Sequence, residues 1–180
     1  MSVTVAEGGN RRVGGPELAE IRQCVLDAKS WFSRSGWESV EGCTSADLQR
    51  LEKTIDFEIP PALAALLSEV NGGLWIMDKQ SFGSRRIAEV YAEKESSKKW
   101  KRDYVPFAGN DDLSALLLVD SSVAGAAVYE WDSEEDCLGD SVASSFGTFI
   151  ETYRNDLLSG QFEYLDGCGV IEKIGAAKRK

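Results

Sequence analysis

The spacing of apolar residues changes at Asn71-Gly72-Gly73, and this change is the strongest constraint on the fold. Upstream, apolar side chains recur every three or four residues, which is the period of an amphipathic helix. Downstream, short apolar or alternating runs are typical of β-strands, and residues 113–119 form a nearly continuous one. Helical spacing returns in residues 141–159. Helices followed by a meander of strands and a final helix predict a single α+β domain.

Three helices are predicted upstream of this triplet. The first spans residues 16–34 and has one apolar face. The second begins at Thr44, where Asp47 can return a hydrogen bond in the manner of a capping box. The third opens at Pro60-Pro61 and covers residues 62–70. The triplet ends it, because glycine adopts the left-handed conformation at little cost.

Short strands are predicted in the middle of the chain, at residues 74–77, 104–108, 113–119, 127–131 and 169–174. Pro106 interrupts the second of them, which predicts a strand at a sheet edge or a strand with a bulge. The third should be central and buried on both faces, and the fourth should complete a hairpin with it. Residues 87–94 fit either a helix or a strand, and residues 132–140 are predicted to form an acidic loop.

The chain has room for one domain, divided into a flexible N-terminal arm (1–15), a peripheral N-terminal helix (16–40), a main domain (41–174) and a basic tail (175–180). No stretch approaches the ~18–20 continuous apolar residues that a membrane span needs. The N-terminus lacks the basic and apolar segments of a secretory signal. These features predict a cytoplasmic protein that does not bind a membrane.

Histidine is absent, which narrows the available chemistry. The chain therefore cannot build a Ser-His or Cys-His nucleophile pair, or a zinc site that contains histidine. Its four cysteines form no Cys-x-x-Cys pair, and no phosphate-binding glycine motif occurs. We expect no cofactor, no metal and no enzymatic activity, although catalysis by paired carboxylates stays open in principle.

The net charge of −10 is distributed unevenly. Residues 103–172 hold 15 acidic side chains and one basic side chain, whereas residues 85–102 hold seven basic and three acidic side chains. The acidic segment would repel a phosphate backbone, so nucleic acid is not expected as the primary ligand. It would attract a protein with a basic surface, mainly by raising the association rate.

The acidic turns supply most of the candidate binding residues. The loop 132–140 fails as an EF-hand, because its sixth and twelfth positions are Cys137 and Ala143 instead of glycine and glutamate. The basic cluster 98–102 could contact RNA or an acidic protein tail, but a salt-bridged or solvated loop is favoured. The predicted protein-binding residues are two tryptophans that flank polar loops and six acids: Trp37, Trp100, Asp111, Asp112, Asp132, Glu134, Glu135 and Asp136.

A series of short motifs resembles the SUKH superfamily, which includes the fungal Smi/Knr-type cell-wall assembly regulators and many bacterial immunity proteins. The resemblance covers about residues 40–160 and implies a mixed, mainly antiparallel sheet with helices packed around it, used as a protein-binding scaffold. It implies no catalytic residues. The motifs are, in order, Asp47-Leu48-Gln49-Arg50-Leu51-Glu52, Ile59-Pro60, Asn71-Gly72-Gly73, Val105-Pro106-Phe107-Ala108, Asp120, Val128-Tyr129-Glu130-Trp131, Val142-Ala143-Ser144-Ser145-Phe146 and Phe149-Ile150.

Three functions follow from the sequence as hypotheses. The first is a non-enzymatic protein-binding module, acting as an adaptor or a stable subunit of a larger multi-protein complex through its acidic surface. The second is an immunity protein that neutralises a cognate basic toxin by the same electrostatic attraction. The third is a carboxylate-based hydrolase or ligand-binding regulator, which would need acidic side chains inside a deep pocket.

Overall fold

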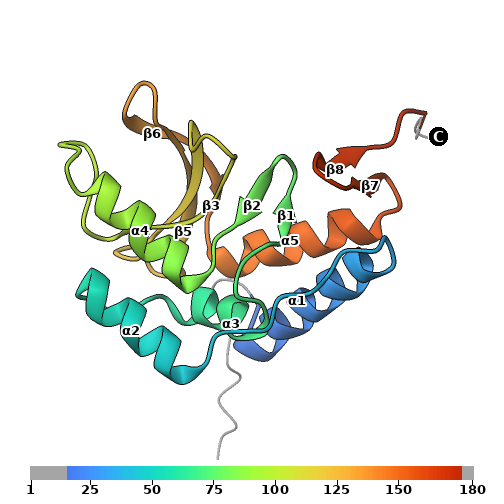
Figure 1. Ribbon diagram of the computed structural model, residues 1–180, viewed down its shortest axis with the longest axis horizontal. Helices are drawn as coiled ribbons and strands as arrows, with labels where there is room; N and C mark the ends of the chain where they lie inside the picture. Colours follow the sequence, from blue (N-terminus) through green and yellow to red (C-terminus); the bar gives the residue numbers. More distant parts are fainter. Residues whose placement is uncertain (1–15, 176–180) are drawn as a thin grey trace, which may run out of the picture.

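The computed structural model describes residues 16–175, so the predicted arm 1–15 and the tail beyond residue 175 lie outside the described residues (Figure 1). The described part is an α+β domain with five helices and eight strands. In chain order the elements are α1 (Leu18–Ser33), α2 (Ser45–Ile55), α3 (Pro61–Glu69), β1 (Trp75–Ile76), β2 (Lys79–Ser81), α4 (Ser84–Lys94), β3 (Tyr104–Gly109), β4 (Ala115–Asp120), β5 (Ala127–Asp132), β6 (Cys137–Ala143), α5 (Phe146–Leu158), β7 (Phe162–Leu165) and β8 (Gly169–Glu172).

Six strands form one curled sheet in the order β1-β2-β3-β4-β5-β6, and β7 and β8 form a separate hairpin. The expected mainly antiparallel sheet is confirmed, and among the described residues every pair of neighbours is antiparallel. The reason is the connectivity. Each strand pairs with the next one in the chain, and even the excursion through α4 returns the chain in the antiparallel direction.

Strand β4 occupies the middle of the sheet, as the apolar run predicts. Residues Leu116 to Asp120 are all buried, although successive side chains of a strand point to opposite faces. Both faces of the sheet are therefore covered here. Strand β5 completes the predicted hairpin, with Val119 opposite Val128 and Leu116 opposite Trp131.

Of the two predicted alternatives for Pro106, the bulge is confirmed and the edge strand is wrong. The register between β3 and β4 shifts between Pro106 and Ala108. On its other side β3 pairs with β2 only at Ala108 and Gly109. The short β2 never reaches Pro106, so the missing N–H of the proline costs no ladder hydrogen bond on that side.

The Asn71-Gly72-Gly73 triplet ends α3 and also helps to start α4. Gly72 and Gly73 both have positive φ, at 90° and 87°. The side chain of Asn71 then accepts a hydrogen bond from the backbone N of Ser84, with a distance of 2.7 Å between Asn71 Oδ1 and Ser84 N. This contact satisfies one of the free donors at the start of a helix, and the ambiguous segment 87–94 is helical.

The final helix is shorter than predicted, and the acidic loop before it is a tight turn. Helix α5 begins at Phe146, where the Ser145 side chain accepts a hydrogen bond from the backbone N of Thr148 at 3.1 Å. The preceding residues 137–143 pair with β5 as strand β6. Val142 therefore belongs to a strand, and its sequence separation from Phe146 matches the helical period only by coincidence.

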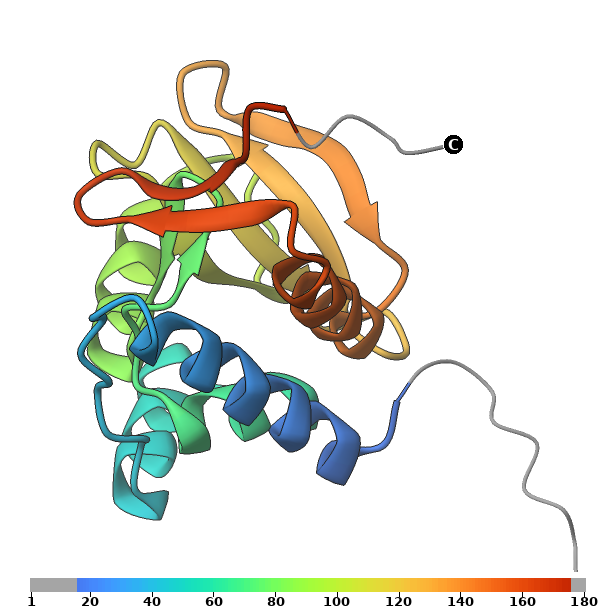
Figure 2. The same ribbon diagram turned by 90° about the vertical axis from the view of Figure 1, so that its right-hand side faces the viewer.

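Helix α1 is part of the core, so the expectation of a peripheral helix is wrong. Helix α5 lies between the sheet and α1 in both views (Figures 1 and 2), and α1 also packs against α3. The apolar stripe that predicts the helix is what places it there. Its buried side chains all belong to the single hydrophobic core: Ile21, Cys24, Val25, Ala28 and Phe32.

Replacement of Phe146 by alanine should lower the free energy of unfolding by about 3–5 kcal/mol, because it removes a fully buried ring. The ring centroid lies 5.1 Å from that of Phe107 and 6.0 Å from that of Phe149. Equilibrium denaturation in urea measures the change. Leu158→Ala, on the same helix but 52% exposed, is the control and should shift the value by less than about 0.5 kcal/mol. Equal effects of the two variants would contradict this packing.

Candidate functional site

Two acidic turns lie side by side at one end of the sheet. In an antiparallel meander the β3–β4 turn and the β5–β6 turn emerge at the same end. The backbone N of Ser133 donates to the carbonyl O of Ser114 at 2.9 Å and joins the two turns. We call this region the acidic end; it comprises six of the predicted binding residues, Asp111, Asp112, Asp132, Glu134, Glu135 and Asp136.

Two of these acids shape the β5–β6 turn. Asp132 Oδ1 accepts hydrogen bonds from the backbone N of Glu134 at 2.9 Å and of Glu135 at 3.0 Å. Asp136 has a left-handed backbone with φ of 47°, and its Oδ2 accepts a hydrogen bond from the Ser97 hydroxyl at 2.7 Å. These contacts fix the turn in one conformation.

Asp112 has a similar role in the β3–β4 turn. Its Oδ1 accepts a hydrogen bond from the backbone N of Ser114 at 3.0 Å. Hydrogen bonding from the side chain and the backbone of Ser114 lowers the pKa of Asp112 below its ordinary value. The carboxylate therefore stays charged at and well below neutral pH, while its side chain remains exposed.

The carboxylates of Asp111, Glu134 and Glu135 are exposed and have no hydrogen-bond or ion-pair partner among residues 16–175. They are carried on turns whose backbone is held by Asp112, Asp132 and Asp136. The acidic end thus presents exposed carboxylates without direct partners from fixed positions.

The loop that carries the basic cluster 98–102 lies beside the acidic end, and hydrogen bonds and an ion pair hold it in place. Lys94 Nζ donates to the Ser133 hydroxyl at 2.9 Å, and Lys99 Nζ donates to the carbonyl O of Glu135 at 3.3 Å. Arg102 forms an ion pair with Asp56 at 2.7 Å. The two lysines bind neutral oxygens, so these contacts hold the loop in place without forming an ion pair with the carboxylates of Glu134 and Glu135.

One of the two candidate tryptophans differs from the prediction, and a binding role for Trp37 stays a prediction. Trp100 is only 9% exposed and packs edge-on against Trp131, at 5.0 Å between ring centroids, so the expectation of a surface anchor at this position is wrong. Its neighbours in the sequence are polar loop residues, but its ring packs in an aromatic cluster with Tyr91 and Tyr104. Trp37 is half-buried, and its Nε1 donates to the carbonyl O of Gly73 at 3.1 Å.

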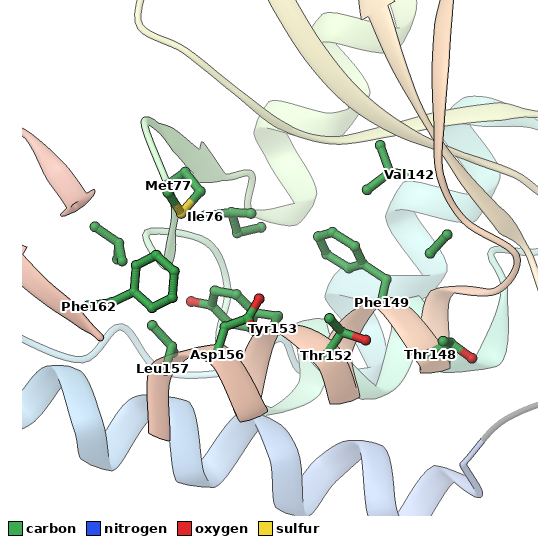
Figure 3. A pocket seen from close by; sticks show the side chains of 12 residues that line it. Ile76, Met77, Val142, Thr148, Phe149, Thr152, Tyr153, Asp156, Leu157 and Phe162 are labelled. Atoms are coloured by element: carbon green, nitrogen blue, oxygen red, sulfur yellow. The ribbon is translucent and has the colours of Figure 1, made fainter. Parts of the chain in front are cut away.

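An apolar groove of about 280 Å³ lies over α5, between β6 on one side and the β1–β2 and β7–β8 hairpins on the other (Figure 3). The sequence analysis missed it, because its walls come from segments that are far apart in the chain. Met77 and Val142 face each other across it and are 47% and 42% exposed. The remaining lining residues are Ile76, Ala143, Thr148, Phe149, Thr152, Tyr153, Asp156, Leu157, Phe162 and Val170.

Two long-range hydrogen bonds hold the groove open in this shape. The Tyr153 hydroxyl donates to the carbonyl O of Trp75 at 2.7 Å and attaches α5 to β1. Burial raises the pKa of Tyr153 well above its ordinary value, so the hydroxyl remains a donor. The backbone N of Val170 donates to the carbonyl O of Met77 at 2.9 Å and attaches β8 to the end of β1.

Neither region has the arrangement that a carboxylate-based hydrolase would use. The carboxylates of the acidic end are in exposed turns, and the groove is lined by a single acid, Asp156. Within residues 16–175 no three potential metal ligands gather in one place. In the same range, no helix combines the length and apolar character required to cross a bilayer.

The turns and strands that build the acidic end coincide with a known family pattern. Residues 42–152 match the sequence model of the SMI1 / KNR4 family (SUKH-1). The protein is a member of this family. No curated protein sequence matches the chain. The SUKH-1 match runs from the residues just before α2 into α5, so it contains the whole acidic end and all six strands of the sheet, whereas α1, β7 and β8 lie outside it.

Replacing Tyr153 by phenylalanine should lower the free energy of unfolding by about 1–3 kcal/mol, because the carbonyl O of Trp75 loses a donor in a partly buried place. Denaturation monitored by circular dichroism measures this. Tyr129→Phe is the matched control, since that half-buried hydroxyl has no partner among residues 16–175. A Tyr153→Phe protein as stable as the control would show that this bond does not hold the groove.

Proposed function

We propose that this SUKH-1 protein is a non-enzymatic binding module that docks a basic surface of another protein on its acidic end. The observation that carries the proposal is the set of exposed carboxylates without direct partners on Asp111, Glu134 and Glu135, which ordered turns hold side by side. Complementary charge raises the association rate and selects against acidic partners. Family membership supports a protein partner.

The fixed turns contribute to affinity as well as to charge. A flexible acidic loop would lose conformational freedom when it bound, whereas these turns are already ordered by the hydrogen bonds of Asp132 and Asp136. The lysines next to them hold the loop 95–100 against the same end. The partner would therefore meet a preformed surface.

Two biological roles use this surface in the same way. As an adaptor or stable subunit, the protein would hold its partner within a larger intracellular assembly. As an immunity protein, it would cover a basic toxin; family membership favours this second role as an alternative. The identity of the bound protein separates them, because a toxin would lose its activity in the complex and a structural partner would not.

Charge reversal by Glu134→Lys and Glu135→Lys together should slow association with the partner by about tenfold or more at low salt. The partner is first isolated by affinity capture from the cells that produce the protein and identified by mass spectrometry. Surface plasmon resonance with that purified partner then gives the rate constants. The difference from the unmodified protein should shrink in 0.5 M salt, where the Debye length falls to about 4 Å.

Glu58→Lys with Glu151→Lys is the matched control, because both residues are exposed acids and the change in net charge is identical. Each lines a pocket that includes Pro16 and no residue of the acidic end. This control should bind nearly as fast as the unmodified protein. Equal slowing by the two double variants would mean that only net charge matters, and unchanged binding by the first would remove the acidic end as the docking surface.

A further inference from the structure

The two edges of the six-stranded sheet differ in length and in whether another element covers them. The edge at β1 is only two residues long and is covered by the C-terminal hairpin, through the hydrogen bond from Val170 N to Met77 O. The edge at β6 is seven residues long and pairs with β5 alone within the part of the chain that the structure describes. An exposed edge presents unpaired N–H and C=O groups that can accept another strand.

Strand β6 connects the two regions described above. Its first residue, Cys137, follows the β5–β6 turn of the acidic end, and its last two residues, Val142 and Ala143, line the apolar groove. At about 3.3 Å per residue the strand spans roughly 20 Å. A segment extended along β6 would thus have carboxylates at one end and an apolar groove at the other.

The groove is suited to side chains of a peptide. Its volume of about 280 Å³ lies near the lower end of the range of about 300–1,000 Å³ that is usual for ligand pockets, which leaves room for a few side chains. Its walls are mostly apolar, and Asp156 is the one charged residue among those that line it. In Figure 3, Met77 and Val142 lie on opposite sides of the groove, above helix α5. A strand added next to β6 would place side chains between them.

The chemistry of β6 disfavours a second copy of this chain as the occupant. Asp140 is the central residue of the strand and is exposed. Two antiparallel copies paired about this centre would bring their Asp140 carboxylates together, which is destabilising. A basic segment meets the opposite situation, since Asp140, Asp156 and the acidic end all attract it.

We propose that an extended, basic segment of the partner protein adds to β6 as a seventh strand and places apolar side chains in the groove over α5. This inference rests on the proposed function and deepens it, because it names the binding mode. Main-chain hydrogen bonds to β6 would supply affinity, and the groove and the carboxylates would select the sequence.

A pair of displayed peptide libraries tests the binding mode without knowledge of the partner. In one, valine, leucine or phenylalanine alternates with lysine or arginine; in the other, glutamate replaces the basic residues. The basic library should be enriched at least tenfold over the acidic one on the immobilised protein. Val142→Glu and Thr152→Glu, at exposed positions of the groove, should each remove the enrichment. Leu158→Glu, exposed on the same helix but outside the groove lining, should retain it.

These substitutions separate the inference from the function on which it rests. Each groove variant adds a negative charge, so attraction of basic peptides by charge alone would be unchanged or stronger. Enrichment that survives Val142→Glu but is lost in the Glu134→Lys, Glu135→Lys protein would leave the acidic end in place and overturn the strand addition. Absence of enrichment on the unmodified protein would also overturn the strand addition, while binding of the captured partner would still report on the acidic end.

Hydrogen exchange gives a second measurement that does not depend on variants. An enriched basic peptide should slow the exchange of backbone amides in residues 137–143, because an added strand pairs with them. Slower exchange confined to the turn at residues 133–136 would contradict the proposal.

Discussion

Burial of β4 on both faces is the constraint on which the rest of the structure depends. Five consecutive residues of this strand are buried, although their side chains alternate between the two faces. Elements must therefore cover the middle of the sheet on each side. Helix α4 contacts β3, and helix α5 contacts β5 and β6. With these strands fixed, the turns between them and the edge at β6 have defined positions.

The sequence predicted those elements whose signals are local. Capping residues, the Asn-Gly-Gly triplet and continuous apolar runs act over a few residues, and α2, α3, β4 and β5 lie close to where they were expected. The predicted start of the last helix was wrong. Val142 and Phe146 have helical spacing by coincidence, because pairing with β5 places Val142 in strand β6. The short β2 has no clear pattern of its own.

The sequence indicated which kinds of residue form the candidate site, but not which of them the fold brings together. Clustered acids in turns indicated a charged surface, yet only the meander topology brings Asp111 and Glu134 to the same end. Trp100 shows the converse error: its neighbours in the sequence are charged, while its neighbours in space are Trp131 and Tyr104. The groove has no sequence signal, since β1, β6, α5 and the C-terminal hairpin meet only after folding.

The packing of helix α1 determines where the folded domain begins. The SUKH-1 match begins at residue 42, but Ile21 and Phe32 are buried to the same extent as core residues inside it, such as Leu51 and Leu63. Removal of the helix would uncover apolar surface on α3 and α5, which α1 packs against. The unit that folds is therefore longer than the unit that is recognisable by sequence. A fragment cut at the family boundary would carry an exposed apolar face and would be prone to aggregate.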